Sequence, residues 1–525
     1  MEIYYNGNIY LNDEGCNKHS AFAVEEGVVK ATGSDEEIMS LSDGSDTMVD
    51  LQGRLVMPGF VDSHLHFIEY AIEKSFVDLS SARSKDELLQ MMRERLPEAL
   101  KKNRPLRGYS FDNNYWEDPS LPTREDLDSI STEIPITVRR TCHHVTVCNT
   151  PALIFCGMME KNPDGILNEE EQNAVLEKLL VFTKDDFKEM IVDACRDAVS
   201  KGITEVQTDD LEYMRKELYG ETILEAYMEL DREERLPIRV YEQCNLPTKE
   251  RLTAFLNKGY RIGQSTGHFT IGPLKLVADG ALGSRTAALR KPYPDDPSNY
   301  GILNFTDQEM DELVDMANRA GMQIAIHGIG DRTIDQIISS FEKALKAYPR
   351  TDHRHGIVHC QITHPEQLKK MKELGLMAYI QPIFLRSDQW IVTERVGEDL
   401  ASTSYDWRTM TDMGIHLGFG SDCPVEPFDV LSNMYYAVEA KDPDKEIPWH
   451  PEHAVTLEEA IRSFTIEGAY ASFSESRRGR ILPGYAADFV VIDRDITALG
   501  PESLTEAKVL FSFVDGKERY RAEKA

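Results

Sequence analysis

The stretch that decides the fold is Val56-Met57-Pro58-Gly59-Phe60-Val61-Asp62-Ser63-His64-Leu65-His66. Apart from Pro58-Gly59, the run up to Val61 is apolar, which is typical of a buried strand. Two histidines follow at a spacing of two, and side chains at that spacing on an extended strand project to the same side. One metal ion could hold both imidazoles, although a pair of histidines near a strand end is also a common hydrogen-bonded core feature. Further ligands elsewhere in the chain are needed to decide.

Composition limits the class of protein. The 525 residues, 41% of them hydrophobic, are enough for a large core and more than one structural unit. The formal net charge of -32 is spread along the chain, which predicts a solvated acidic surface and argues against nucleic acid as a partner. The sequence shows neither a signal-peptide pattern nor an apolar run of bilayer-spanning length. We therefore expect a cytoplasmic protein with no membrane association.

Both ends of the chain read as short strands separated by turns. At the N-terminal end these stretches are residues 3–11, 21–32 and 48–55; at the C-terminal end they are 488–493 and 509–514, before the turn Asp515-Gly516-Lys517. Neither end has enough apolar residues for a core of its own. We predict that residues 1–57 and 476–525 pair as one small β-sandwich.

From Phe187 onward, short strands alternate with amphipathic helices, such as those expected at 310–320 and 334–341. Seven Val- and Ile-rich stretches read as buried parallel strands, and residues 56–66 supply the eighth: the seven are 203–206, 238–241, 274–277, 323–326, 356–358, 377–380 and 416–419. This pattern predicts an α/β fold, a (β/α)8 TIM-type barrel over residues 58–475 whose last helix, at 456–473, leads back to the sandwich. Residues 76–184 break the alternation. We predict an α+β insertion there, with a helix at 85–101 and a strand at 134–140, over the barrel mouth.

Potential metal ligands gather where the active site of such a barrel is expected, at the carboxyl ends of the strands. Strand one ends in His64 and His66 and strand four carries Lys275, while strands five, six and eight lead to His327, His359 and Asp422. Each of these side chains is of a metal-ligating or acid-base type. Their convergence favours a metal site on one rim.

The order His-x-His, Lys, His, His, Asp resembles the amidohydrolase superfamily. More closely, the chain is similar to the branch that contains N-substituted formamide deformylases and predicted metal-dependent hydrolases. The matching segments are residues 58–66, 275–285, 327–331 and 420–427, together with 121–128 inside the insertion, so the resemblance covers nearly the whole chain.

This resemblance implies a role for each residue on the rim. His64 and His66 would bind one divalent ion and His327 and His359 a second, with zinc as the expected metal. Lys275 would bridge the ions as a carbamate formed with carbon dioxide. Asp422 would ligate one ion, take a proton from the attacking water and pass it to the leaving nitrogen.

The residues themselves leave other interpretations open. Lys275 could be a rim lysine paired with Asp279, and Asp422 could cap the helix expected at 430–439. Three further residues are candidates for substrate binding: His144, Arg285 and Asp331. His144 belongs to Cys142-His143-His144, where relatives show Asp-Gly-His, and an Arg paired with a carboxylate is more often scaffold than catalyst.

The predicted activity is metal-dependent hydrolysis of a non-peptide C–N bond, in an N-acyl or formamide-like amide, by a metal-bridging hydroxide with Asp422 as general base. Two alternatives are a deaminase that uses one ion on the same barrel and a catalytically silent scaffold; Lys275 argues against the first and the complete ligand set against the second. Gly356 and Val358 replace charged residues of the relatives, so the surroundings of His359 must differ and the amide stays open. The expected partner is a small-molecule substrate, and the surface is compatible with a homodimer.

Overall fold

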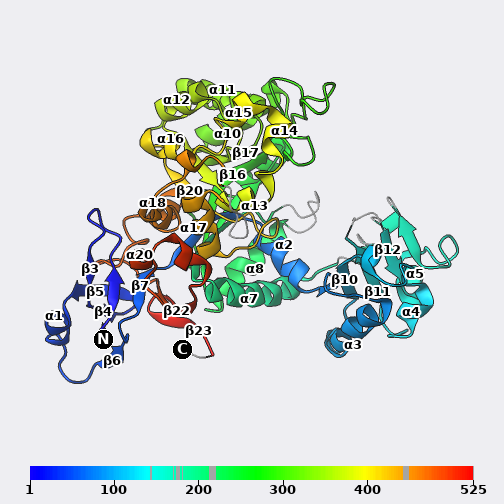
Figure 1. The fold of residues 1–525 in the computed structure, drawn as a ribbon, viewed down its shortest axis with the longest axis horizontal. Helices are drawn as coiled ribbons and strands as arrows, with labels where there is room; N and C mark the ends of the chain where they lie inside the picture. Colours follow the sequence, from blue (N-terminus) through cyan, green and yellow to red (C-terminus); the bar gives the residue numbers. More distant parts are fainter. Residues whose placement is uncertain are drawn as a thin grey trace. The chain divides into compact units, whose positions relative to one another are not determined.

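The computed structural model describes residues 1–141, 145–168, 171–172, 175, 178–179, 181–211, 220–441 and 448–523. The chain forms two compact units, one made of Met1–Glu69 and Ile191–Ala525 and the other of Tyr70–Met190 (Figure 1). Within the described ranges, no helix is both long and apolar enough to cross a membrane.

The first unit contains an eight-stranded parallel barrel. Its strands follow one another in the order β8 (Phe60–Leu65), β14 (Ile203–Thr208), β15 (Arg239–Asn245), β16 (Phe269–Val277), β17 (Ile324–Gly328), β18 (Gly356–His359), β19 (Met377–Ile380) and β20 (Leu417–Phe419). The segment after β20 closes the ring on β8, since the Asp422 N–H donates to the His64 carbonyl at 2.8 Å. The predicted (β/α)8 barrel is confirmed, and each of its eight strands overlaps a stretch expected to form one.

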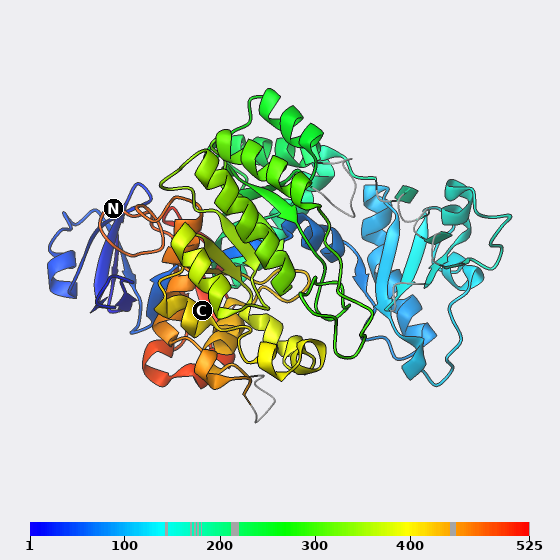
Figure 2. The same cartoon turned by 90° about the horizontal axis from the view of Figure 1, so that it is seen from above.

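Helices cover the outside of the barrel. They include α8 (Gly220–Arg232), α9 (Lys249–Asn257), α10 (Asp307–Arg319), α11 (Asp331–Ala347), α12 (Pro365–Leu374) and α17 (Val430–Glu439). In Figure 2 the green to yellow helices of the later barrel lie around the strands. Each buries one apolar stripe, as α11 does with Ile334, Ile337 and Phe341.

The prediction of a single helix at 456–473 is wrong. The structure has α18 (Leu457–Ser463) and α19 (Ile466–Ala471), with a break at Thr465, whose φ and ψ are -133° and -90°. The Thr465 hydroxyl donates to the Ile461 carbonyl at 2.6 Å and accepts from Asn12 Nδ2 at 2.9 Å. The helix is therefore broken where Thr465 contacts the N-terminal segment. Helical periodicity in the sequence gives no sign of such a contact.

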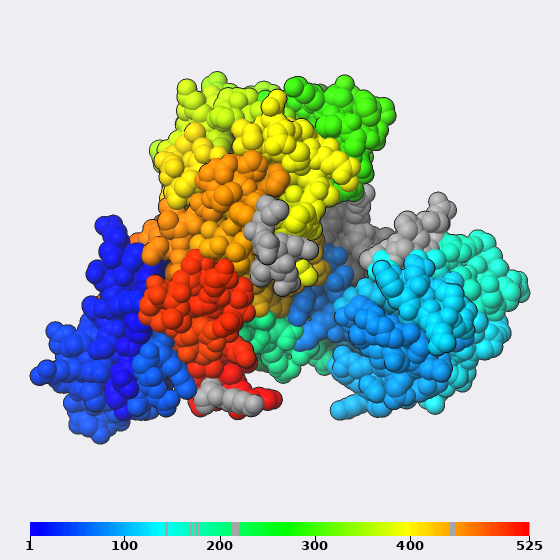
Figure 3. Space-filling view, in the orientation of Figure 1, coloured from blue at the N-terminus to red at the C-terminus, as the bar shows by residue number. Residues whose placement is uncertain are grey.

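The two chain ends build the predicted sandwich from two sheets. One contains β5 (Val28–Gly33), β4 (Ala21–Glu25), β1 (Glu2–Tyr5) and β6 (Thr47–Asp50); the other contains β23 (Lys517–Arg521), β22 (Val509–Val514), β21 (Phe489–Ile492), β7 (Leu55–Pro58), β2 (Asn8–Tyr10) and β3 (Lys18–His19). Antiparallel pairing of β7 with β21 joins the two ends. Stacked aromatic pairs, Tyr4 on Phe22 and Phe489 on Phe513, fill the space between the sheets. Figure 3 shows the blue N-terminal and red C-terminal surfaces in contact.

The decisive stretch is two strands rather than one. Its first half, β7, belongs to the sandwich, and its second half, β8, belongs to the barrel. The switch falls at Gly59, where the backbone passes so close to Thr204 that a β-carbon would collide with that side chain. A glycine at this position lets one segment connect the two sheets.

The second unit has its own sheet and core. The sheet order is β13 (Ile166–Asn168), β12 (Val145–Cys148), β11 (Ile136–Arg140), β10 (Leu106–Phe111) and β9 (Val77–Asp78), accompanied by α3 (Lys85–Lys102), α4 (Arg124–Asp128) and α5 (Thr150–Cys156). Leu88 and Met92 of α3 pack in one apolar cluster with Phe111 and Val138 of the sheet. The predicted helix and strand of the insertion are both present. Its position over the barrel mouth stays a prediction.

Candidate metal centre

His64 and His66 meet Asp422 at the rim of the barrel. His64 is the penultimate residue of β8, His66 follows the strand, and Asp422 lies shortly after β20. The two Nε2 atoms lie 3.4 and 3.2 Å from the same atom, Asp422 Oδ1. One ligating atom from each residue thus falls within 4.8 Å of the other two. The predicted pair therefore shares a site with a third residue from the opposite end of the barrel sequence.

Each of the four predicted histidine ligands has an oxygen atom close to its Nδ1. The contacts are His64 to Gln243 Oε1 at 2.8 Å, His66 to the Asp209 carbonyl at 3.2 Å, His327 to Asp279 Oδ1 at 3.0 Å, and His359 to Gln381 Oε1 at 2.7 Å. The contacts of His64, His66 and His359 are hydrogen bonds to oxygen acceptors, which place a proton on Nδ1 of each ring, whereas His327 Nδ1 lies near Asp279 without forming a hydrogen bond. In the first three rings Nε2 therefore faces the centre as a prospective metal ligand, the arrangement that supporting acceptors give to metal-bound imidazoles.

Two prospective ligand atoms, His64 Nε2 and Asp422 Oδ1, are buried without a hydrogen bond from the described part of the chain, and so is His327 Nδ1. A buried polar atom that lacks a partner costs about 1–3 kcal/mol. A cation between the two atoms would satisfy both of them. The residues present therefore fit a divalent ion.

The electrostatics of the site also suit a cation. Burial lowers the pKa of His64 well below its ordinary value and, with a smaller effect from His327, lowers the pKa of His359 to about 3. Burial alone would raise the pKa of Asp422, but His66, His359 and His64 outweigh it and hold that pKa below its usual range. His66 differs, since its contact with Asp422 outweighs burial and raises its pKa to about 9.

The second half of the predicted ligand set lies beside the first. The ring centroids of His327 and His359 are 4.5 Å apart, and those of His64 and His359 are 5.6 Å apart. Lys275 on β16 is 1% exposed. The structure thus brings all six predicted side chains to the same rim, where His359 and Asp422 adopt left-handed backbone angles with φ of 72° and 60°. Such conformations in non-glycine residues concentrate at functional sites.

Two alternative interpretations from the sequence are wrong. Lys275 Nζ pairs with Asp209 Oδ2 at 3.1 Å and not with Asp279, which instead accepts the backbone N–H groups of Ile329 and Gly330. Asp422 does not cap α17. That helix is capped by Asp429, which accepts the Ser432 N–H.

Sequence reasoning missed three residues that support the ligands: Asp209, Gln243 and Gln381. Asp209 follows β14, Gln243 lies near the end of β15, and Gln381 follows β19. These are barrel strands two, three and seven, for which the sequence analysis predicted no site residue. The available signal was a polar side chain at the carboxyl end of an otherwise buried strand.

The weaker substrate-binding predictions remain predictions. His144 lies outside the described residues. Arg285 is bound to Asp295 at 2.6 Å, and Asp331 accepts from His364 Nε2 and the Arg290 N–H, each at 2.9 Å. In the described structure both residues therefore have protein partners typical of scaffold.

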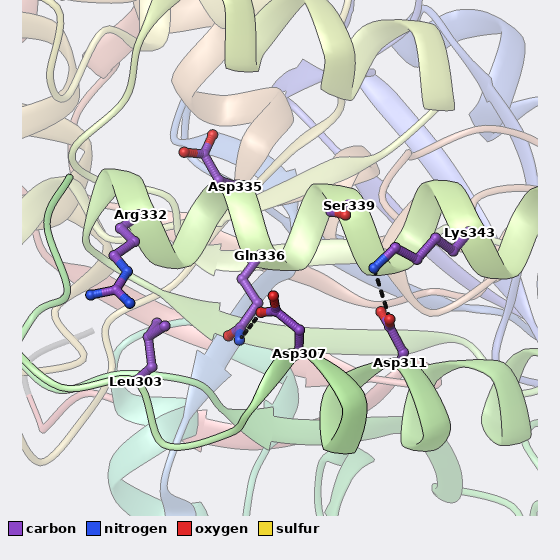
Figure 4. Close-up of a pocket in the computed structure, with 8 residues that line it drawn as sticks. All are labelled: Leu303, Asp307, Asp311, Arg332, Asp335, Gln336, Ser339 and Lys343. Carbon is purple, nitrogen blue, oxygen red and sulfur yellow. Dashed lines mark hydrogen bonds and ion pairs between the residues drawn. The ribbon is translucent and has the colours of Figure 1, made fainter.

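A separate cavity of about 290 Å³ lies between α10 and α11 (Figure 4). Two of its contacts join the helices: Gln336 Nε2 donates to Asp307 Oδ1 and Lys343 Nζ to Asp311 Oδ2, each at 2.8 Å. None of the six predicted ligands is among its lining residues, so the cavity is distinct from the metal centre.

Comparisons with known proteins agree with this site. An amidohydrolase family model matches residues 47–520. The chain is 31% identical to the putative amidohydrolase YtcJ of Bacillus subtilis, over 99% of both chains, and 24% identical to the N-substituted formamide deformylase of Arthrobacter pascens, over 98% of this chain and 97% of that protein. The crystal structure of an uncharacterized metal-dependent hydrolase from Pyrococcus furiosus superposes with a TM-score of 0.80 at 28% identity, covering 95% of this chain and 99% of the other.

The barrel and its rim of histidines define a metal-dependent hydrolase. The chain belongs to the amidohydrolase family.

Proposed function

We propose that this amidohydrolase cleaves a non-peptide C–N bond, in an N-acyl or formamide-like amide, using two divalent ions that we take to be zinc. The observation that carries the proposal is the common arrangement of His64, His66 and His359, each hydrogen-bonded through Nδ1 so that Nε2 remains for a metal. Imidazole nitrogen and carboxylate oxygen are preferred zinc ligands. The similarity to an N-substituted formamide deformylase supports the amide class.

The ligands would divide between two positions. His64, His66 and Asp422 would hold one ion, and His327 with His359 the other. Bound there, the ions would polarise the substrate carbonyl and make a water molecule acidic enough to attack near neutral pH.

Asp422 is suited to proton transfer. Its carboxylate is ionised at neutral pH because the neighbouring histidines stabilise the charge. It would accept a proton from the attacking water and return it to the nitrogen of the breaking C–N bond, so that the amine leaves uncharged. The main chain of Asp422 is fixed beside β8 by the hydrogen bond from its N–H to the His64 carbonyl.

Lys275 would complete the centre as a carbamate. Its free amine would add to carbon dioxide, forming one N–C bond and releasing one proton to solvent. The product would keep one N–H and gain a carboxylate, a group that can ligate divalent ions. An unmodified ammonium cannot ligate a cation.

Substrate screening tests the proposal. Zinc-loaded protein should release amine from some members of a panel of N-formyl and N-acetyl amines, and chelator-treated protein should not. Deamination of amidines or aromatic amines without amide hydrolysis would contradict the proposal in favour of the deaminase. No turnover by protein that holds its metal would favour the scaffold.

A further inference from the structure

One buried aspartate touches both halves of the proposed centre, one half through its main chain and the other through its side chain. Asp209, 3% exposed, follows β14. Its main-chain oxygen accepts from His66 Nδ1 at 3.2 Å, and its Oδ2 accepts from Lys275 Nζ at 3.1 Å. Asp209 therefore contacts one proposed ligand of the first ion and the proposed bridge to the second.

Lys275 depends on Asp209 for its orientation. In the described part of the chain, Asp209 is the one carboxylate within 4 Å of Lys275 Nζ. The carboxylates of Asp210 and Glu242 have other partners: Glu242 Oε1 accepts the Asp210 main-chain N–H at 3.0 Å, and Asp210 Oδ2 accepts the Tyr227 hydroxyl at 2.7 Å. A lysine nitrogen buried this deeply needs a partner that fixes it.

The contact would survive carboxylation of the lysine. A carbamate nitrogen keeps one N–H, and an oxygen of Asp209 can accept it as readily as it accepts the ammonium. That hydrogen bond would set the rotation about the Cε–Nζ bond and so the direction of the carbamate oxygens. Asn245 Nδ2 lies 3.4 Å from the same Asp209 oxygen and supports its position.

We propose that Asp209 is the positioning residue of the metal bridge, acting as a hydrogen-bond acceptor for the Lys275 nitrogen. This inference rests on the two-ion function proposed above. Under this proposal, the side chain of Asp209 matters only for binding of the second ion. Its contact with His66 is made by the main chain and persists when the side chain is changed.

Two substitutions separate the acceptor from the charge. Asp209→Asn keeps an acceptor oxygen. Asp209→Leu has the same branched shape but no acceptor oxygen. The zinc content of each reconstituted protein would be measured by elemental analysis, and the carbamate by ¹³C NMR after equilibration with ¹³C-bicarbonate. Asp488→Leu is the matched control, since Asp488 is buried, pairs with Arg239 at 3.0 Å and lies outside the centre.

We expect two ions and a carbamate signal in the wild type, Asp209→Asn and Asp488→Leu, and one ion without the signal in Asp209→Leu. The proposal is overturned if Asp209→Leu keeps both ions and the signal, or if Asp209→Asn loses them as well. Circular dichroism checks folding, and Asp209→Ala repeats the test if leucine is not tolerated. A wild type with fewer than two ions would refute the two-ion function itself and this inference with it. If the wild type holds two ions, the results for the variants test only the role of Asp209.

Discussion

Gln381 holds the ring of His359 by a 2.7 Å contact between Oε1 and Nδ1. The other end of the Gln381 amide donates to the Tyr379 carbonyl at 3.2 Å, so Oε1 is fixed as the acceptor. The proton of His359 is thereby kept on Nδ1. Gln243 does the same for His64, since its Nε2 donates to the Ser63 carbonyl at 3.0 Å. Each proposed ion thus depends on one glutamine.

Replacing either glutamine by leucine should weaken one ion selectively. Losing a partner that orients a metal ligand costs about 10–100-fold in affinity. Gln381→Leu should lower zinc affinity at the His327–His359 position and Gln243→Leu at the His64–His66 position, as measured by competition with a chromophoric chelator. Each variant serves as the control for the other, and equal weakening of both ions in both variants would contradict the assignment.

Asp422→Asn should remove the proton carrier while keeping an oxygen ligand. General acid-base catalysis contributes about 10²–10⁴-fold. We expect kcat to fall by about that factor on an amide substrate, with the melting temperature close to that of the wild type. A variant that keeps its metal and loses less than about tenfold would place the proton transfer on another group.

Metal uptake should release a proton from His66. The pKa of His66 is raised to about 9 in the metal-free protein, so its ring is mostly charged at pH 7 and must lose a proton to bind. Zinc affinity should therefore rise by about tenfold per pH unit from pH 7 toward pH 9 and then level off. Calorimetry in buffers of different ionisation enthalpy measures the protons released. A zinc affinity that does not change with pH above pH 7 would contradict the raised pKa of His66.

Gly59 offers a test of the fold. Gly59→Val should lower stability by about 1–3 kcal/mol, because the added atoms overpack the contact with Thr204. Adding Thr204→Ala to that variant should restore part of the loss. The measurement is the midpoint of chemical unfolding for both variants and for Thr204→Ala alone. Strictly additive effects would show that the two residues do not collide.

The sequence predicted the elements whose signal is local. Short apolar runs marked each barrel strand, and the predicted ligands stand out as polar residues in or beside those runs. Asp209 was missed because an acidic residue after a strand looks like an ordinary loop residue until the neighbouring strand brings Lys275 against it. The break at Thr465 and the switch at Gly59 likewise follow from contacts with Asn12 and Thr204, which are far away in the sequence or invisible to periodicity.

The central claim is a two-ion centre bridged by Lys275, and the most direct test is the metal content of the purified protein. After reconstitution with zinc and bicarbonate, elemental analysis should find close to two ions per chain in the wild type and one in Lys275→Ala. One ion or none in the wild type, or two in Lys275→Ala, would contradict the account.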